Sequence, residues 1–222
     1  MLLSFVLYAG FVTFAAALLL LIRRDTRAVA GFCALLGVIL IVAALAWPVR
    51  SQRSTGAATH LDRAMPEWQF REQHATHVAA PPERVFASIR PVTADEIWLF
   101  RTLTAIRRLG RPLPAGVMNA PKSEPLLDIA TRTSFRYLAM DPPRELVVGT
   151  IVVPPRAVLA TMNFLVTPDG SGGSLLSTET RVLAANDSIT WRFAIYWRFI
   201  RPGSDIIRRM WLRAIKKRAE GV

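Results

Sequence analysis

Residues 158–184 read VLATMNFLVTPDGSGGSLLSTETRVLA, and this stretch decides the fold class. Two largely apolar runs, 158–167 and 175–184, flank the loop 168–173, whose proline and three glycines are typical of a turn. Together they predict a β-hairpin. Upstream, 133–140 and 144–153 flank the turn sequence Asp141-Pro142-Pro143 in the same way. Consecutive strands joined by tight turns favour an antiparallel sheet.

Before these strands, the pattern indicates one more strand and two helices. Residues 68–78 have strand character, and 79–86 begin a helix with prolines suited to its first turn. Thr93 and Glu96 have the spacing of a capping box, which predicts a second helix that ends at Gly110.

The C-terminal region ends in helix, by a pattern that is partly ambiguous. Residues 189–200 fit a strand by strict alternation and a helix by their apolar face, and the capping residue Asn186 favours the helix. Pro202 then opens a last helix with one apolar stripe and one basic face. The order of strands and helices predicts an α+β domain over residues 66–222.

The N-terminus predicts a transmembrane helical hairpin. Residues 2–22 and 28–49 are two uncharged apolar runs, each about as long as a hydrocarbon core requires, and the segment 23–27 between them carries three arginines. A cleaved signal peptide is the alternative. It is disfavoured because no basic residue precedes the first run and that run is too long.

Composition agrees with a membrane-anchored chain that carries a polar domain. Of its 222 residues 52% are hydrophobic, the mean hydropathy is +0.30 and the formal net charge is +12. One cysteine and modest glycine and proline contents exclude disulfide-rich and collagen-like classes. The small polar residues of 50–65 indicate a juxtamembrane linker. Three arginines lie near each end of the hairpin, so the positive-inside rule leaves its orientation open.

Two motifs resemble the SRPBCC superfamily, which includes START, Bet v 1 and polyketide-cyclase-like proteins. The sequence VAAPPERVF at 78–86 resembles its strand-to-helix opening. The pair VTPDG at 166–170 and STETRV at 177–182 resembles a later hairpin, and a long C-terminal helix is typical of these proteins. The resemblance covers about residues 67–220.

The resemblance implies a helix-grip fold, in which a curved antiparallel sheet grips the last helix around a hydrophobic cavity. Members bind lipids, sterols, polyketides or other apolar ligands, and some catalyse cyclisation. The candidates for lining such a cavity are apolar or aromatic residues of the strands and the last helix, and all of them could equally be core: Phe135, Tyr137, Val147, Met162, Phe164, Ile207 and Trp211.

Polar residues suggest no catalytic constellation. The histidines are His60, His74 and His77, and the last two would face opposite sides of one strand, so they cannot share a metal ion. We therefore expect no metal site and no cofactor. The polar side chains closest to a predicted cavity are Glu179, Asp128, Tyr137 and Arg136. Alternation favours a solvated strand face for Glu179, away from Thr178 and Thr180.

The last helix carries a basic face that could contact anionic lipid headgroups. Residues 201–218 hold seven basic residues and one acid, and the candidates for membrane contact are Arg208, Arg209, Arg213, Lys216 and Lys217. The alternative is a helix that packs its apolar stripe on the sheet and leaves its basic face in water. Binding to nucleic acid is not expected, because the aromatic residues near this helix suit packing better than base stacking.

These observations leave three hypotheses. The first is a membrane-anchored protein that binds a hydrophobic ligand, as in lipid binding or transfer, with the bilayer as its partner. The second is a cyclase- or hydratase-like enzyme of the same fold, and the third is a membrane-bound scaffold. The first hypothesis is preferred, with a multi-pass location in the cell membrane. The domain is expected in the cytoplasm, because members of the family are usually found there and because the chain is basic.

Overall fold

The computed structural model describes residues 1–152 and 157–221, and its contacts divide the chain into two units. One unit contains Met1–Arg50 together with Trp191–Pro202, and the other contains Ser51–Thr190 and Gly203–Val222. In this division residues 191–202 group with the N-terminal helices, while the single domain 66–222 stays a prediction.

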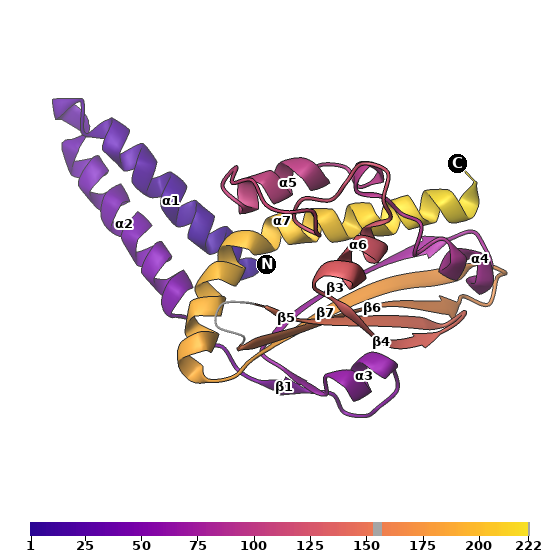
Figure 1. Ribbon diagram of the computed structural model, residues 1–222. Helices are drawn as coiled ribbons and strands as arrows, with labels where there is room; N and C mark the ends of the chain where they lie inside the picture. Colours follow the sequence, from indigo (N-terminus) through magenta and orange to yellow (C-terminus); the bar gives the residue numbers. More distant parts are fainter. Residues whose placement is uncertain (153–156, 222) are drawn as a thin grey trace. The chain divides into compact units, whose positions relative to one another are not determined.

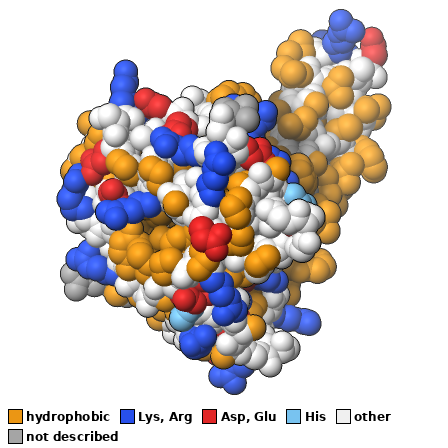
Figure 2. Space-filling view, turned by 90° about the vertical axis from the view of Figure 1, so that its right-hand side faces the viewer, with side chains coloured by type: hydrophobic (Ala, Val, Ile, Leu, Met, Phe, Trp, Pro, Cys, Tyr) orange, Lys and Arg blue, Asp and Glu red, His pale blue; other side chains and the backbone are white. Residues whose placement is uncertain are grey.

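The first unit is built on two apolar helices, as the sequence predicts. Helix α1 covers Leu2–Leu20 and α2 covers Arg27–Ala46, with the short 3-10 turn η1, Arg24–Thr26, between them. Both are long and apolar enough to cross a membrane. Figure 2 shows hydrophobic side chains over most of the hairpin surface, with charged side chains gathered at its tip.

Two glycines let the backbones of α1 and α2 approach closely. A Cβ atom on Gly37 would lie 2.8 Å from the backbone nitrogen of Phe14, and one on Gly10 would lie 3.0 Å from the carbonyl oxygen of Gly37. Small residues at such a crossing are typical of packed membrane helices. A third glycine, Gly31 on α2, has open space around it.

The second unit contains a five-stranded antiparallel sheet among the described residues (Figure 1). The spatial order is β3-β7-β6-β5-β4. Three consecutive hairpins join β4 to β7, and β3, which comes earlier in the chain, pairs with β7. The strands are β3 Phe70–Val78, β4 Arg136–Asp141, β5 Glu145–Val152, β6 Val158–Pro168 and β7 Ser174–Ala184. The predicted antiparallel sheet is confirmed, while Val153, the predicted end of β5, lies outside the described residues.

A second group of elements covers this sheet. Helix α7, Asp187–Glu220, packs its C-terminal part on one face, and α3 covers the other face (Figure 1). The remaining elements are β1 Gln52–Arg53, α3 His60–Ala64, β2 Glu67–Trp68, α4 Pro82–Ala87, η2 Ala94–Glu96, α5 Phe100–Arg107 and α6 Leu126–Thr133.

Four sequence-based predictions of local structure need correction. The segment 50–65 is more than a linker, because it forms β1 and α3. Residue 133 ends a helix, α6, where a strand was expected. The capping box of Thr93 and Glu96 begins the short turn η2 and not a long helix. The helix α5 begins separately at Phe100, after Leu99, whose backbone is left-handed. The last correction concerns α7.

Helix α7 is one continuous helix from Asp187 to Glu220, so the predicted helix over 189–200 is confirmed. Pro202 lies inside it and does not begin a new helix. A proline in a helix removes one backbone donor, which usually ends or kinks the helix. Here both flanks are anchored by burial, through Ala194 before the proline and Trp211 after it, and the helix continues.

We expect Gly37→Val to destabilise the hairpin, because its side chain would overlap the α1 backbone and overpacking costs about 1–3 kcal/mol. Gly31→Val is the matched control, since its side chain meets open space on the same helix. Thermal unfolding of the full chain in detergent measures the difference. Equal melting temperatures for the two variants would contradict close packing at this crossing.

Candidate functional site

The candidate site lies on the face of the sheet that α7 covers. Strand register places Glu72 of β3, Thr180 of β7 and Met162 of β6 side by side across the sheet. We call these three residues the inner row. Met162 belongs to the hydrophobic core, so the inner row brings a carboxylate and a hydroxyl into an otherwise apolar layer.

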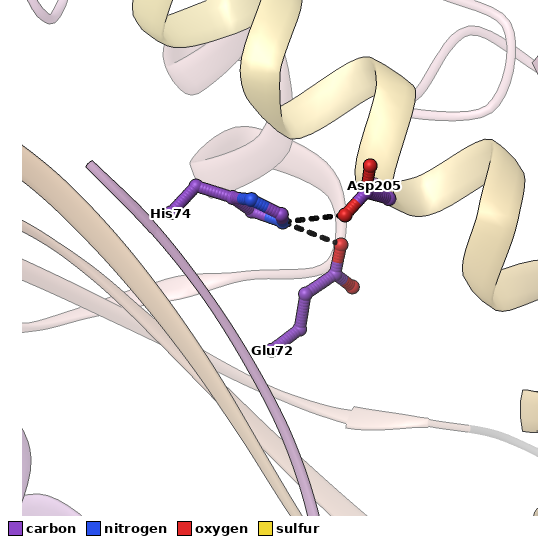
Figure 3. Close-up of side chains that lie close together, drawn as sticks. All are labelled: Glu72, His74 and Asp205. Carbon is purple, nitrogen blue, oxygen red and sulfur yellow. Dashed lines mark hydrogen bonds and ion pairs between the residues drawn. The ribbon is translucent and has the colours of Figure 1, made fainter. Parts of the chain in front are cut away.

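A buried cluster of one histidine and two carboxylates joins the inner row to α7 (Figure 3). His74 Nε2 lies 3.0 Å from Glu72 Oε1 and 3.5 Å from Asp205 Oδ1. Ser204 Oγ donates to Glu72 Oε2 at 2.8 Å, and Arg209 Nε donates to Asp205 Oδ2 at 2.8 Å. All three members of the cluster are buried. They could hold a metal ion or act in proton transfer.

Next to this cluster are polar groups whose hydrogen-bonding capacity is unused among the described residues. Trp211 Nε1 and Thr180 Oγ1 are buried without a partner there. Arg208 points inward, where its guanidinium contacts Met162 Sδ and lies 5.7 Å from the centre of the Trp211 ring. Burial lowers the pKa of Arg208, and the charge of Glu72 offsets only part of this effect.

Five of the predicted cavity residues meet in the layer between sheet and α7. Met162, Phe164 and Trp211 are buried core residues, and Phe135 and Ile207 pack against them. The rings of Phe164 and Trp211 are in contact, with centroids 5.1 Å apart. These residues share one layer, as the sequence predicts, and whether they line a ligand site stays a prediction.

The other two predicted cavity residues, Val147 and Tyr137, lie elsewhere. Val147 is fully buried but faces away from α7, because its neighbours Leu146 and Val148 belong to the core beneath that helix. Tyr137 is 37% exposed on the edge strand β4. The alternation of side chains along β5 was the signal that could have placed Val147 on the other face from Leu146 and Val148, and so outside the predicted cavity.

The face of the sheet opposite α7 holds a charged network instead of solvent. Arg181 Nη2 donates to Asp62 Oδ1 and its Nε donates to Glu179 Oε1, both at 2.7 Å. Arg71 Nε also donates to Glu179 Oε1, at 2.8 Å. Arg181 further stacks over Trp68, 3.9 Å from the ring centre. The expected solvated position of Glu179 is therefore wrong, because segment 50–65 and β2 cover this face.

The network keeps its carboxylates ionised. Burial by itself raises the pKa of Glu179, but hydrogen bonds from Arg71 and Arg181 outweigh it, and the pKa is lowered. Burial also acts against ionisation of Asp62, and bonds from Arg181 and Thr59 again lower its pKa. A hollow of about 590 Å³ opens beside the network, lined by Gln52, Trp68, Arg71 and Arg181 among others.

The remaining polar candidates do not join the inner row. Asp128 pairs with Arg90 at 2.7 Å on the surface, and Arg136 is exposed and donates to backbone carbonyls. His60 Nε2 lies 3.1 Å from Asp141, and His77 is exposed. His74 and His77 face opposite sides of β3, as predicted.

The sequence analysis missed Glu72, Ser204 and Asp205. The signal for Glu72 was its spacing of two from His74, which places both side chains on one face of a strand. Asp205 and Ser204 join them only through the packing of α7 on the sheet. That packing depends on contacts far apart in the sequence.

The predicted basic face of α7 is only partly a surface. Arg208 is half-buried, and its guanidinium contacts Met162 Sδ; whether it contacts a membrane stays a prediction. Arg209 bonds to Asp205, and Lys216 Nζ donates to the His77 carbonyl at 2.8 Å. Arg213 and Lys217 are exposed and line a hollow of about 450 Å³ together with Glu96, Trp98 and Met210.

We expect Glu179→Gln to weaken the pH dependence of stability. Lowered folded-state pKa values mean that ionised Glu179 and Asp62 stabilise the fold above their ordinary pKa values, 4.5 and 3.8. This contribution is lost as the pH falls through the lowered values. Denaturant unfolding between pH 7 and pH 3 should therefore show a smaller loss for Glu179→Gln than for the wild type, from a lower starting stability.

Glu67→Gln is the control for this prediction, because Glu67 lies in an exposed pair 4.0 Å from Arg53. Its pH profile should match that of the wild type. An acid-dependent loss in Glu179→Gln as large as in the wild type would contradict the role given to Glu179.

Comparison with known proteins completes the description of this site. No family model and no curated protein matches the sequence. Solved structures with some likeness include CalU16 from Micromonospora echinospora, at 17% identity over 78% of this chain and 94% of that one, with a TM-score of 0.31. They also include the di-domain ARO/CYC protein BexL, at 13% identity over 90% of this chain and 58% of that one, with a TM-score of 0.39.

The protein named Ara h 8.0201 is similar at 10% identity over 69% of this chain and 99% of that one, with a TM-score of 0.31. Scores this low carry no argument about function, so the fold assignment rests on the arrangement seen in the chain itself. Among the described residues of the second unit, five antiparallel strands pack against the C-terminal part of α7, and a helical segment separates β3 from the other strands along the chain. This is an α+β domain with the helix-grip arrangement.

Proposed function

We propose that this protein is anchored in a membrane by its helical hairpin and that its helix-grip domain binds an amphipathic ligand, a lipid-like molecule with an anionic head. The observation that carries the proposal is the half-buried guanidinium of Arg208, which points at the core residue Met162 and has no carboxylate hydrogen-bond partner among the described residues. A charge held against apolar side chains without a hydrogen-bonded partner is costly, so a position of this kind is a candidate for ligand recognition.

The chemistry of the neighbouring groups specifies the head of this ligand. Arginine and tryptophan side chains can only donate hydrogen bonds, so the partner missing from Trp211 Nε1, and any further partner of the Arg208 guanidinium, must be an acceptor. A carboxylate or phosphate offers several acceptor oxygens and a balancing negative charge. Thr180 Oγ1, also without a partner in the described part of the chain, supplies a third group from the inner row of the sheet.

The body of the ligand would be apolar, since the layer around these groups consists of Met162, Phe164, Ile207 and other core residues. The rings of Phe164 and Trp211 touch, so an entering ligand displaces side chains rather than filling a rigid hollow. The flexible side chain of Met162, which lies at the Arg208 guanidinium, is well suited to such repacking.

We expect Arg208→Met to abolish the preference for an acidic head. The probe is cis-parinaric acid, compared by fluorescence with its methyl ester, on the full chain in detergent after lipid removal. A charge-assisted hydrogen bond contributes about 1.5–3 kcal/mol, so the wild type should bind the acid roughly 10–100-fold more tightly than the ester. In Arg208→Met the two affinities should become equal.

Arg213→Met is the matched control, because Arg213 lies on the exposed side of the same helix. It should keep the preference of the wild type for the acid. A wild type that binds neither probe, or an Arg208→Met variant that still prefers the acid, would refute the proposed ligand class.

We expect the full chain to resist extraction from membranes at alkaline pH, as proteins with spanning helices do. Ile39→Arg, near the middle of α2, should lower the inserted fraction, because a charge there costs about 2.5–3.5 kcal/mol. A reporter fused to the C-terminus should give the signal of a cytoplasmic domain. Release of the wild type into the supernatant would contradict the anchor, and a signal from the opposite side would correct the orientation alone.

A further inference from the structure

We propose that Glu72, His74 and Asp205 form a binding site for a divalent transition-metal ion such as Zn²⁺ or Mn²⁺. Each residue offers one ligand atom, and the three atoms lie within 4.8 Å of one another. Two come from one face of β3 and the third from α7, so the ion would tie the edge of the sheet to the terminal helix (Figure 3). The proposal is independent of the ligand proposed above.

The spacing of the ligand atoms matches a shared ion. Nitrogen and oxygen ligands bind such ions at about 2.1 Å, which places neighbouring ligand atoms about 3.0–3.4 Å apart in octahedral or tetrahedral geometry. His74 Nε2 lies 3.0 Å from Glu72 Oε1 and 3.5 Å from Asp205 Oδ1. These two spacings fit a shared ion, and the donor atoms of Glu72 and Asp205 lie within 4.8 Å of each other.

One short contact of this cluster, between His74 Nε2 and Asp205 Oδ1, is an ion pair without a hydrogen bond of its own. His74 Nε2 has either one hydrogen or one lone pair, yet it faces two carboxylate oxygens (Figure 3). A single hydrogen cannot point at both oxygens with good geometry. A cation between the three atoms would interact with the lone pair of the imidazole and with both carboxylates at once.

The outer hydrogen bonds orient the two carboxylates. In Glu72, Oε2 accepts from Ser204 Oγ at 2.8 Å and leaves Oε1 toward His74. In Asp205, Oδ2 accepts from Arg209 Nε at 2.8 Å, while Oδ1 faces His74 and accepts a longer bond of 3.3 Å from Arg209 Nη2. Partners of this kind fix metal-ligating side chains in known sites.

The charges around the cluster set its selectivity. The two carboxylates face two guanidinium groups, those of Arg208 and Arg209, which weakens attraction for any cation. A weakly attracting site must rely on ligand type, and imidazole nitrogen with two carboxylates suits Zn²⁺ or Mn²⁺ better than Mg²⁺, which prefers oxygen and water. Three protein ligands also leave at least one coordination position open.

The test is metal binding by the full chain in detergent, after treatment with EDTA. Isothermal titration with Zn²⁺ and with Mn²⁺ should give one site per chain for at least one ion, with no comparable site for Mg²⁺. His74→Gln and Asp205→Asn should each weaken that site at least 10-fold. His77→Gln is the matched control, because His77 lies on the exposed face of the same strand, and it should bind as the wild type does.

Thermal unfolding provides a second measurement. The bound ion should raise the melting temperature of the wild type and of His77→Gln but leave that of His74→Gln unchanged. Should His74→Gln and Asp205→Asn fail to fold, Ser204→Ala decides, because it removes only an outer hydrogen bond and should weaken binding several-fold. No site in the wild type, or equal binding by the wild type, His74→Gln and Ser204→Ala, would overturn the proposal.

Discussion

Burial of the five-stranded sheet on both faces is the constraint on which the rest of this structure depends. An antiparallel sheet commonly leaves one face in water, where polar side chains need no partner from the protein. Here the C-terminal part of α7 covers one face, while α3 with β1 and β2 covers the other. Polar groups on either face must then find partners inside the protein or carry an energetic cost.

The two faces meet this requirement differently. Beneath α3, the carboxylate of Glu179 is held by Arg71 and Arg181, and Arg181 also bonds to Asp62. In this network each of these charged groups has a partner within the protein, which is typical of a structural role. Beneath α7, Trp211 Nε1 and Thr180 Oγ1 have no partner among the described residues. The contrast makes the α7 side the candidate for a ligand or ion site, because a buried polar group without a partner calls for a specific explanation.

The hairpin unit is ordered by different forces. Its outer surface is apolar, and the approach of α1 to α2 depends on glycine rather than on large side chains. Within this unit Phe199 of α7 also packs against Phe11, and Arg198 Nη2 donates to the carbonyl of Trp47 at 2.6 Å, where α2 ends. A cation at a helix C-terminus complements the helix dipole.

The sequence by itself determined what depends on local pattern: the apolar runs of α1 and α2 and the hairpin of β6 and β7 around its glycine-rich loop. For residues 189–200 it only favoured helix over strand. It also separated His74 from His77, because strand alternation is local. Only the tertiary structure decided that residues 50–65 cover a sheet face, that Pro202 is carried within α7 and that Asp205 meets Glu72 and His74. These outcomes depend on which distant segment of the chain covers each position and which charged groups it brings. Contacts between distant segments produce no periodic pattern in the sequence.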